Sequence, residues 1–368
     1  AIGARDLNGD LKPELYLAND YGPDRLLVNR SRSGQLSFKV AVGARSFAMP
    51  KSKSLGHDTY KGMGVDFGNL NNDGYPDIVV SNVTSDFAFE ESNFAFRNTG
   101  ETGRLAQGVA TFFDDSESLG ISRSGFSWDI RFGDFDNDGS DELVQATGFI
   151  AGTKNQWPEL HEQAIANPTL MTFPVAWANN SGEHDVSGKE PNRFWVKNSG
   201  GRFIDIAKAL GLDTDVPSRG ITTADLDGDG DLDLVVANQW ADSFVAINTC
   251  STCGRSLNLD VKLPIAPTDL PIVKSGTGAD LRRGRSAIGA EIIVTTKSDR
   301  RHFAYVDGGN GHSGKRSAEA HIGLGDVSAS EPVEVEVRYR TPSGDVTSTT
   351  LSVLPGRHTI YLPWSRHD

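Results

Sequence analysis

A nine-residue pattern of acidic and amide side chains occurs four times in this chain, and it limits the possible folds more than any other feature. In its fullest copy, residues 225–233, aspartates occupy positions 1, 3, 5 and 9, and an apolar run follows at once. Carboxylates spaced in this way suit a hard cation such as Ca²⁺, which takes six to eight oxygen ligands. Gly230, at position 6, permits the sharp turn that brings these oxygens together. The sequence therefore predicts a calcium loop followed by a β-strand.

The other three copies begin at residues 6, 69 and 134, so that successive copies start 63, 65 and 91 residues apart. In each copy, positions 1, 3, 5 and 9 carry Asp, Asn or Glu, and position 7 is expected to contribute its backbone carbonyl. Four matching copies predict about four bound calcium ions. The predicted metal ligands are Asp6, Asn8, Asp10, Lys12 and Glu14; Asn69, Asn71, Asp73, Tyr75 and Asp77; Asp134, Asp136, Asp138, Ser140 and Glu142; and Asp225, Asp227, Asp229, Asp231 and Asp233.

The sequence around the loops indicates strands rather than helices. Position 12 of the fourth loop is Val236, where a helical EF-hand needs a bidentate Glu and a flanking helix. An apolar strand follows every loop, and two further strand-like runs come next, the first of which ends in Asn29, Asn98, Asn198 or Asn248. Several short strands in a repeat of about 64 residues are typical of a propeller blade. We therefore expect an all-β chain with a β-propeller.

The loops resemble those of the FG-GAP repeats in the integrin α-subunit propeller and of the related VCBS repeats, and Phe132-Gly133-Asp134 carries the Phe-Gly motif. The resemblance covers about residues 1–250. It implies that the four units belong to a ring that usually has seven blades. The first unit lacks a recognisable entering strand, so we expect upstream blades or a neighbouring chain to complete the ring.

A second domain follows the repeats, after a connection punctuated by Pro264, Pro267 and Pro271. Residues 333–339 alternate apolar and charged side chains, as a half-buried antiparallel strand does. We expect a propeller at residues 1–254 and a small β-sandwich at residues 255–368. The segments that resemble motifs of the ASPIC/UnbV domain are residues 285–290, 320–325 and 337–344.

The longer spacing before the fourth loop places an insertion within about residues 150–192. Residues 156–168 are predicted to form a short helix, with Pro158 near its first turn. One interpretation makes the insertion a wall of a ligand pocket, because loops of this length are often functional. The alternative is a lid that buries Trp157, Phe173 and Trp177 against a propeller face. The candidate ligand-binding residues are Trp157, His161, Glu162 and His184.

The two cysteines, Cys250 and Cys253, form a CxxC motif. A c-type haem would need His after the second cysteine, where Gly254 stands, and no matching pair of further zinc ligands is evident. A local disulfide in an oxidising compartment is the favoured interpretation.

The formal net charge of −13 argues against nucleic acid or an anionic membrane as a partner. No run of about 18 apolar residues is present, so we expect no membrane insertion. No signal peptide is visible, and the start at Ala1 favours a processed or partial chain.

These features favour a secreted protein, extracellular, periplasmic or at a cell surface, that acts as an interaction or adhesion module. Its partner would be a protein or glycan bound at a propeller face. Two alternatives stay open. A propeller-based lyase or hydrolase would need His161, His184 and Arg219 to converge in one pocket near the insertion. A structural subunit would have its propeller completed within a larger surface assembly.

Overall fold

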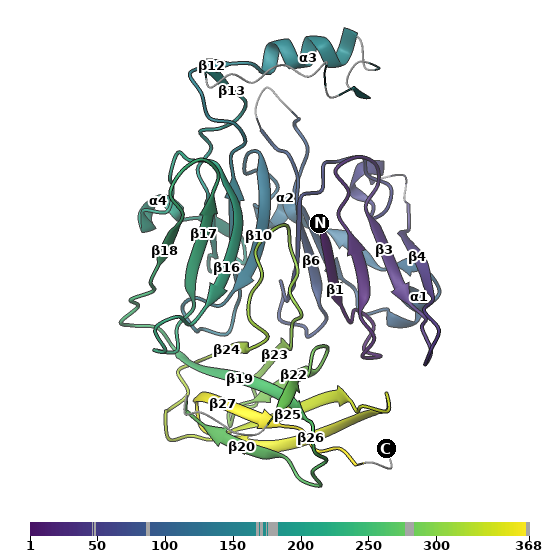
Figure 1. Ribbon diagram of the computed structural model, residues 1–368, viewed down its shortest axis with the longest axis vertical. Helices are drawn as coiled ribbons and strands as arrows, with labels where there is room; N and C mark the ends of the chain where they lie inside the picture. Colours follow the sequence, from purple (N-terminus) through teal and green to yellow (C-terminus); the bar gives the residue numbers. More distant parts are fainter. Residues whose placement is uncertain are drawn as a thin grey trace.

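The computed structural model describes residues 1–368 except 46, 48, 86–88, 167–168, 170–171, 174, 176–182, 277–282 and 366–368. β-Strands make up most of its regular structure. Figure 1 shows four sheets side by side in an arc, which we number blades 1 to 4 in chain order, above a sandwich formed by the C-terminal part. The predicted mostly β architecture is confirmed.

Blades 1 to 3 are antiparallel meanders of four strands, whereas blade 4 has three. β1 is the first strand of blade 1, so the expectation that this blade lacks its entering strand is wrong; four residues before the first loop were too few to recognise. The strands are β1 (Ile2–Arg5), β2 (Glu14–Leu17), β3 (Arg25–Asn29) and β4 (Phe38–Gly43) in blade 1; β5 (Gly64–Gly68), β6 (Asp77–Ser81), β7 (Phe94–Asn98) and β9 (Phe112–Asp114) in blade 2; β10 (Ser127–Gly133), β11 (Glu142–Thr147), β14 (Arg193–Lys197) and β15 (Phe203–Asp205) in blade 3; and β16 (Ser218–Ala224), β17 (Asp233–Asn238) and β18 (Phe244–Ala246) in blade 4.

The blades pack face to face through apolar side chains that alternate along their strands. One core cluster joins blades 1 and 2, a second joins blades 2 and 3, and a third joins blades 3 and 4. β6 and β11 are buried along their whole length, as expected for strands covered on both faces. The short strand β8 (Val109–Ala110) pairs in parallel with β4 and so ties blade 2 to blade 1.

The inner strands β1, β5, β10 and β16 follow one another around the arc, and the sheets do not close into a ring within the described residues. The expected total of seven blades therefore stays a prediction. A loop of the second domain, residues 307–317, enters the arc between blades 4 and 1 (Figure 1). We call this loop the plug.

The C-terminal part is a β-sandwich around a single apolar core. Residues 255–264, expected to be a connection, instead form the central strand β19, in which Leu257, Leu259, Val261 and Leu263 are buried at alternate positions. One sheet contains β20 (Ile272–Ser275), β27 (Gly356–Tyr361), β19 (Arg255–Pro264), β21 (Gly284–Ser286) and β24 (Ala320–Gly325); the other contains β23 (Arg301–Tyr305), β22 (Glu291–Thr295), β25 (Val333–Arg340) and β26 (Val346–Val353).

The insertion lies on the face of the arc that is opposite the sandwich (Figure 1). β12 (Lys154–Asn155) pairs in parallel with β13 (His184–Asp185), and the predicted helix is present as α3 (Trp157–Ala166). Phe173 is 54% exposed, so its expected burial is wrong, and Trp177 lies outside the described residues. The remaining helices are α1 (Thr102–Ala106), α2 (Ser116–Leu119), α4 (Ala207–Leu210) and the 3₁₀ turn η1 (Lys51–Lys53). No helix in the described part of the chain is long and apolar enough to cross a membrane.

Candidate metal centres

The four acidic loops share one backbone conformation. Position 4 has a positive φ in every loop, at Gly9 (80°), Asn72 (58°), Asn137 (58°) and Gly228 (85°), and Gly and Asn are the residues that best tolerate it. Position 6 is also left-handed, at Leu11 (59°), Gly74 (86°), Gly139 (91°) and Gly230 (101°). All four copies of the loop carry Gly or Asn at position 4, so the sequence alone could have predicted this left-handed turn.

Backbone amides orient the side chains of each loop in the same way. The side-chain oxygen at position 3 accepts a hydrogen bond from the amide of position 5, and the oxygen at position 5 accepts from the amide of position 7, over 2.7–3.4 Å in all four loops. Such local turns are characteristic of Asp and Asn. They leave each carboxylate or amide a second lone-pair direction for a cation.

Position 9 anchors each loop to its blade. The buried carboxylates of Glu14, Asp77, Glu142 and Asp233 each accept a hydrogen bond from the amide of position 2, at 2.7–2.9 Å. In blades 1, 2 and 4 the other oxygen accepts from the amide of an asparagine at the end of the third strand or, for Asn248, two residues beyond it, at 2.7–3.2 Å. This residue closes the loop against the sheet, as the sequence predicted for the ninth position.

Two of these asparagines, Asn98 and Asn248, also connect neighbouring loops. The Asn98 side chain donates to the carbonyl of Leu7 in the loop of blade 1, at 3.3 Å, and the Asn248 side chain donates to that of Phe135 in the loop of blade 3, at 2.7 Å. In blade 3 the strand register places Lys197, not Asn198, at this position. The expected equivalence of Asn198 is therefore wrong by one residue.

Carboxylates converge in the third and fourth loops. One oxygen from each of Asp134, Asp136 and Asp138 lies within 4.8 Å of the others, and the same holds for Asp225, Asp227 and Asp233. The Oδ1 atom of Asp134 is buried and has no hydrogen-bond partner in the structure. An all-oxygen, acidic donor set with an unpartnered buried oxygen fits a calcium ion.

The first and second loops are arranged less favourably for a cation. In the first loop, the Lys12 ammonium lies 3.5 Å from Asp10, and the Asn8 amide donates to Glu14 at 3.0 Å. In the second loop, the Asn71 amide donates to Asp73 at 2.7 Å. These internal donors would have to move before an ion could be bound there.

Burial raises the pKa of four acids in the first three loops. Burial is the main cause that raises the pKa of Glu14 to about 8, of Asp77 to about 7, of Asp134 to about 8 and of Glu142 to about 9. A divalent cation reverses this effect because it favours the ionised form of every ligand. The residues therefore fit calcium, which would supply the positive charge that the loops lack.

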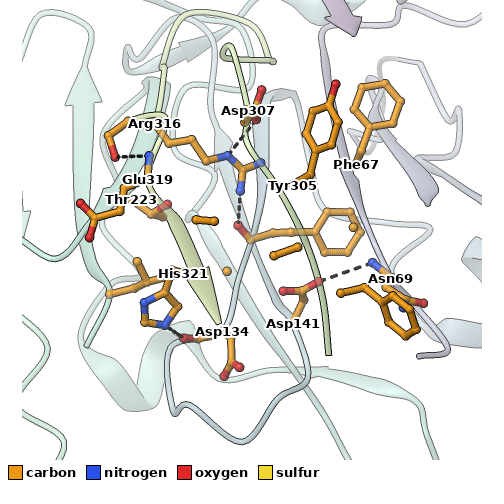
Figure 2. Close-up of a pocket in the computed structure, with 18 of the residues that line it drawn as sticks. Phe67, Asn69, Asp134, Asp141, Thr223, Tyr305, Asp307, Arg316, Glu319 and His321 are labelled. Carbon is orange, nitrogen blue, oxygen red and sulfur yellow. Dashed lines mark hydrogen bonds and ion pairs between the residues drawn. The ribbon is translucent and has the colours of Figure 1, made fainter. Parts of the chain in front are cut away.

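The acidic loops face the sandwich. Arg340 donates to the carbonyl of Leu11 at 3.0 Å, Arg300 to that of Asp138 at 3.1 Å, and the amide of Gly325 to that of Asn137 at 2.7 Å. Figure 2 shows the cavity of about 280 Å³ that remains between these parts. His321, on its wall, contacts the Asp134 carbonyl, and burial lowers its pKa to about 4. The loops thus form part of the interdomain contact.

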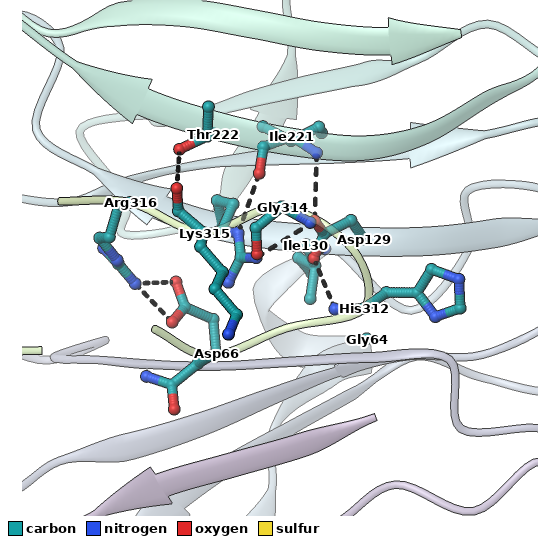
Figure 3. Close-up of polar contacts among 12 residues, drawn as sticks. Gly64, Asp66, Asp129, Ile130, Ile221, Thr222, His312, Gly314, Lys315 and Arg316 are labelled. Carbon is teal, nitrogen blue, oxygen red and sulfur yellow. Dashed lines mark hydrogen bonds and ion pairs between the residues drawn. The ribbon is translucent and has the colours of Figure 1, made fainter. Parts of the chain in front are cut away.

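The plug is held at the centre of the arc by buried charges. Asp129 accepts hydrogen bonds from the amides of His312 and Gly314, both at 3.1 Å (Figure 3). Arg316 pairs with Asp66, and Thr222 donates to the carbonyl of Lys315 at 2.7 Å. These contacts join blades 2, 3 and 4 to the sandwich.

Of the predicted ligand-binding residues of the insertion, Trp157 and His161 are in contact, whereas Glu162 and His184 have other environments. Trp157 is buried, donates to the Ser187 hydroxyl at 2.7 Å and anchors the insertion on the blades. His161 packs edge-on against Phe89 and Trp157, Glu162 is exposed, and His184 is half-buried in β13.

Arg219 lies over the Trp128 ring, 4.1 Å from its centroid, and donates to the carbonyls of Gly148 and Phe149. The structure therefore gives Arg219 and the two histidines different neighbours. A role of the insertion in ligand binding stays a prediction.

Cys250 and Cys253 form the predicted disulfide, directly after β18. The amide of Gly254 then donates to the carbonyl of Asp136 at 2.9 Å, so the bridged turn lies against the third loop.

Comparison with known proteins agrees with both parts of this architecture. Residues 6–80 and 175–236 match the FG-GAP-like repeat family, and residues 280–366 match the family named ASPIC and UnbV. The chain carries FG-GAP-like repeats followed by an ASPIC and UnbV domain. The third loop, at residues 134–142, lies outside the matched segments, yet it has the same geometry as the others.

The chain is homologous to cartilage acidic protein 1. It is 24% identical to the mouse protein over 379 residues, which cover 96% of this chain and 53% of the relative, and 24% identical to the human protein over 382 residues, which cover 96% and 51%. The chain thus spans about half the length of these curated relatives.

Among solved structures, a match covers 97% of this chain and 89% of a Ca²⁺-stabilised adhesin described as helping an Antarctic bacterium bind ice, at 11% identity. Its TM-score of 0.15 is too low to carry an argument about fold or function.

Proposed function

We propose that this protein is an extracellular calcium-binding propeller protein that acts as an interaction or adhesion module. The loop geometry supports calcium, because four loops present oxygen ligands in one conserved arrangement of turns. The disulfide supports an oxidising compartment, where such bonds persist.

One observation carries the proposal. The connection between the second and third strands of every blade holds an exposed aromatic side chain: Tyr21 (75% exposed), Phe89 (36%), Phe173 (54%) and Trp240 (72%). These connections lie at the ends of the strands away from the acidic loops and the sandwich. Exposed aromatic side chains are the residues that most often anchor a protein or glycan partner. We call this surface the aromatic face.

Calcium would act through stability in this proposal. The acidic loops contact the sandwich at the opposite ends of the blades, so their ions would hold the blades rigid instead of touching the partner. A rigid scaffold that presents several loops on one side suits binding. The enzyme alternative has less support, since Arg219 is engaged by ring and carbonyl contacts and the candidate histidines have other neighbours.

The test is a triple variant, Tyr21→Ser, Phe173→Ser and Trp240→Ser, in the calcium-loaded protein. Binding to an immobilised extracellular-matrix extract and to an array of neutral glycans is measured, and we expect the triple variant to bind at least about tenfold more weakly than the wild type. The matched control replaces Leu36, Ile265 and Leu270, which are also exposed but lie away from the aromatic face. Equal binding by wild type and triple variant, or no binding by the wild type, would refute the proposal.

A further inference from the structure

A seven-residue turn, residues 248–254, contacts both of the acidic loops in which carboxylates converge. It lies between β18 and β19 and contains the Cys250–Cys253 disulfide, so we call it the disulfide turn. The loops that it contacts, the third and the fourth, are those in which oxygens of three carboxylates lie within 4.8 Å of one another. The turn is therefore placed to act on two candidate calcium sites at once.

The first end of the disulfide turn binds one atom of each loop. The backbone amide of Asn248 donates to the Asp233 carboxylate in the fourth loop at 2.8 Å. The side chain of the same residue donates to the Phe135 carbonyl in the third loop at 2.7 Å. Asp233 is a predicted calcium ligand, and Phe135 directly follows the predicted ligand Asp134. Asn248 therefore fixes the spacing between the two loops.

The second end of the turn packs closely on the third loop. The Gly254 amide donates to the Asp136 carbonyl at 2.9 Å, and the Asn137 side chain donates to the Gly254 carbonyl at 3.4 Å. A Cβ atom on residue 254 would lie 2.4 Å from the Asn137 carbonyl oxygen, so only glycine fits there. The Asn137 side chain also donates to Asp231 of the fourth loop, at 2.7 Å. Through Asn137, this end too connects both loops.

The disulfide is the covalent link between the two ends of the turn. The Cys250 amide donates to the Asn248 side chain at 3.2 Å, and the Cys253 sulfur lies 3.6 Å from the Phe135 carbonyl. Ser251 and Thr252, between the cysteines, are exposed. When the disulfide is reduced, the two ends are joined only by the backbone of the turn and gain conformational freedom. Holding the loops in place then costs more conformational entropy.

Calcium binding should respond to this freedom. The affinity of a calcium loop depends on the rigidity of the site as well as on the charge of its ligands. A loop that the oxidised turn already holds in place loses less conformational entropy when an ion binds. The buried, unpartnered Oδ1 atom of Asp134 belongs to the third loop, on which both ends of the turn pack.

We propose that the disulfide turn positions the third and fourth loops for calcium, and that bound calcium in turn protects the Cys250–Cys253 disulfide from reduction. Linkage makes the two effects equal: the factor by which the disulfide strengthens calcium binding is the factor by which calcium shifts the thiol–disulfide equilibrium.

Both cysteines are half-buried in a surface turn, where a small thiol such as glutathione reaches them. Two glutathione thiols reduce the bond, which gives two cysteine thiols and one glutathione disulfide. The inference rests on the proposed calcium binding and adds to it a dependence on redox state.

The first test measures the thiol–disulfide equilibrium of the folded protein in glutathione redox buffers, once with saturating calcium and once with excess chelator. Thiols are trapped by alkylation and counted by mass spectrometry. We expect calcium to raise the equilibrium constant for disulfide formation at least about fivefold. Equal constants under the two conditions would overturn the inference.

Two matched pairs of substitutions assign the effect to particular loops. Asp138→Asn with Asp229→Asn removes a carboxylate from position 5 of the third and fourth loops. At the lowest calcium concentration that saturates the wild type, this variant should lose most of the shift. Asp10→Asn with Asp73→Asn makes the same change in the first and second loops and should keep it.

Asparagine retains the side-chain oxygen that accepts from the amide of position 7, so the turns of all four loops are preserved. Equal loss of the shift in the two variants would mean that calcium acts through the whole fold, and the inference would fail.

The reverse measurement is a calorimetric calcium titration of the oxidised wild type and of the variant with Cys250→Ser and Cys253→Ser. We expect two sites of the variant to bind calcium at least about fivefold more weakly and the others to be unchanged. Thermal melts check that the variant folds. Unchanged affinity at every site would overturn the inference and leave calcium binding intact, whereas failure of the oxidised wild type to bind calcium would overturn both.

Discussion

At the scale of single residues, Asp24 is a buried acid outside the acidic loops. Its carboxylate is buried and accepts hydrogen bonds from the Tyr16 hydroxyl at 2.7 Å and from the Asn19 amide at 2.8 Å, while its own amide donates to Asp58. Burial, and then repulsion from Asp58, raises the pKa of Asp24 to about 7. The folded protein therefore favours the protonated form.

This shift predicts a defined pH dependence. The folded-state pKa of Asp24 lies above the ordinary value. Its stabilising contribution to the free energy of unfolding is therefore fully present below about pH 4 and is lost as the pH rises through about 7. Asp24→Asn mimics the neutral acid, so from pH 5 to 8 its stability should rise relative to the wild type by on the order of 2 kcal/mol. Chemical denaturation in saturating calcium measures the difference. Parallel stability curves for the two proteins would contradict the assignment.

A second prediction at this scale concerns the asparagines that join neighbouring loops. Asn98→Ala removes the side-chain donor to two carbonyls, those of Leu7 and Pro76, and should destabilise the protein by about 1–3 kcal/mol. Asn198→Ala is the matched control, because the Asn198 side chain is exposed and accepts bonds only from its own turn. Equal losses in urea denaturation would show that the inter-loop bonds add nothing.

At the scale of elements, the acidic loops should differ in affinity. Loop 69–77 offers two carboxylates at its side-chain ligand positions, Asp73 and Asp77, whereas the third and fourth loops offer four each. Affinity for calcium follows ligand charge and rigidity. We therefore expect this loop to empty first as calcium is withdrawn, which native mass spectrometry of single-loop variants can follow. Simultaneous loss of all four ions would contradict the charge argument.

The elements also show how far sequence reasoning reaches. The loops, the strands after them and α3 follow from local patterns, in which carboxylate spacing or apolar runs settle the structure. Lys197 was missed because only the strand register reveals which residue faces the loop. At β19 the nearby prolines predict a connection, and this prediction is wrong because the alternation of Leu257, Leu259, Val261 and Leu263 forms the central strand of the sandwich.

At the scale of the whole molecule, the arrangement of the two parts had no signal in the sequence. The plug is a glycine-rich loop whose contacts, to Asp66 and Asp129 among others, join residues about 180–250 positions apart and depend on the completed fold. The charged residues Asp129 and Arg131 are nearly fully buried within β10, where they pair with each other, contact the backbone of Ile221 in blade 4 and bond to the plug.

The plug yields a prediction about domain docking. Arg316→Met leaves the Asp66 carboxylate buried without its partner and should destabilise the protein by about 3–5 kcal/mol. Adding Asp66→Asn to that variant should recover a large part of the loss, since the uncompensated charge is then gone. Equilibrium unfolding of the wild type, both single variants and the double variant measures the coupling. Strictly additive effects would mean that the pair does not hold the plug.

The central claim is that calcium in the acidic loops stabilises the propeller and, through the loop contacts, the sandwich docked on it. The most direct measurement is calorimetric unfolding with saturating calcium and with excess chelator, with metal analysis to confirm removal. The account predicts a lower melting temperature for both parts after chelation, and recovery on adding calcium but not magnesium, which demands near-ideal octahedral geometry and gives up its waters reluctantly. An unchanged melting temperature in metal-free protein would contradict it.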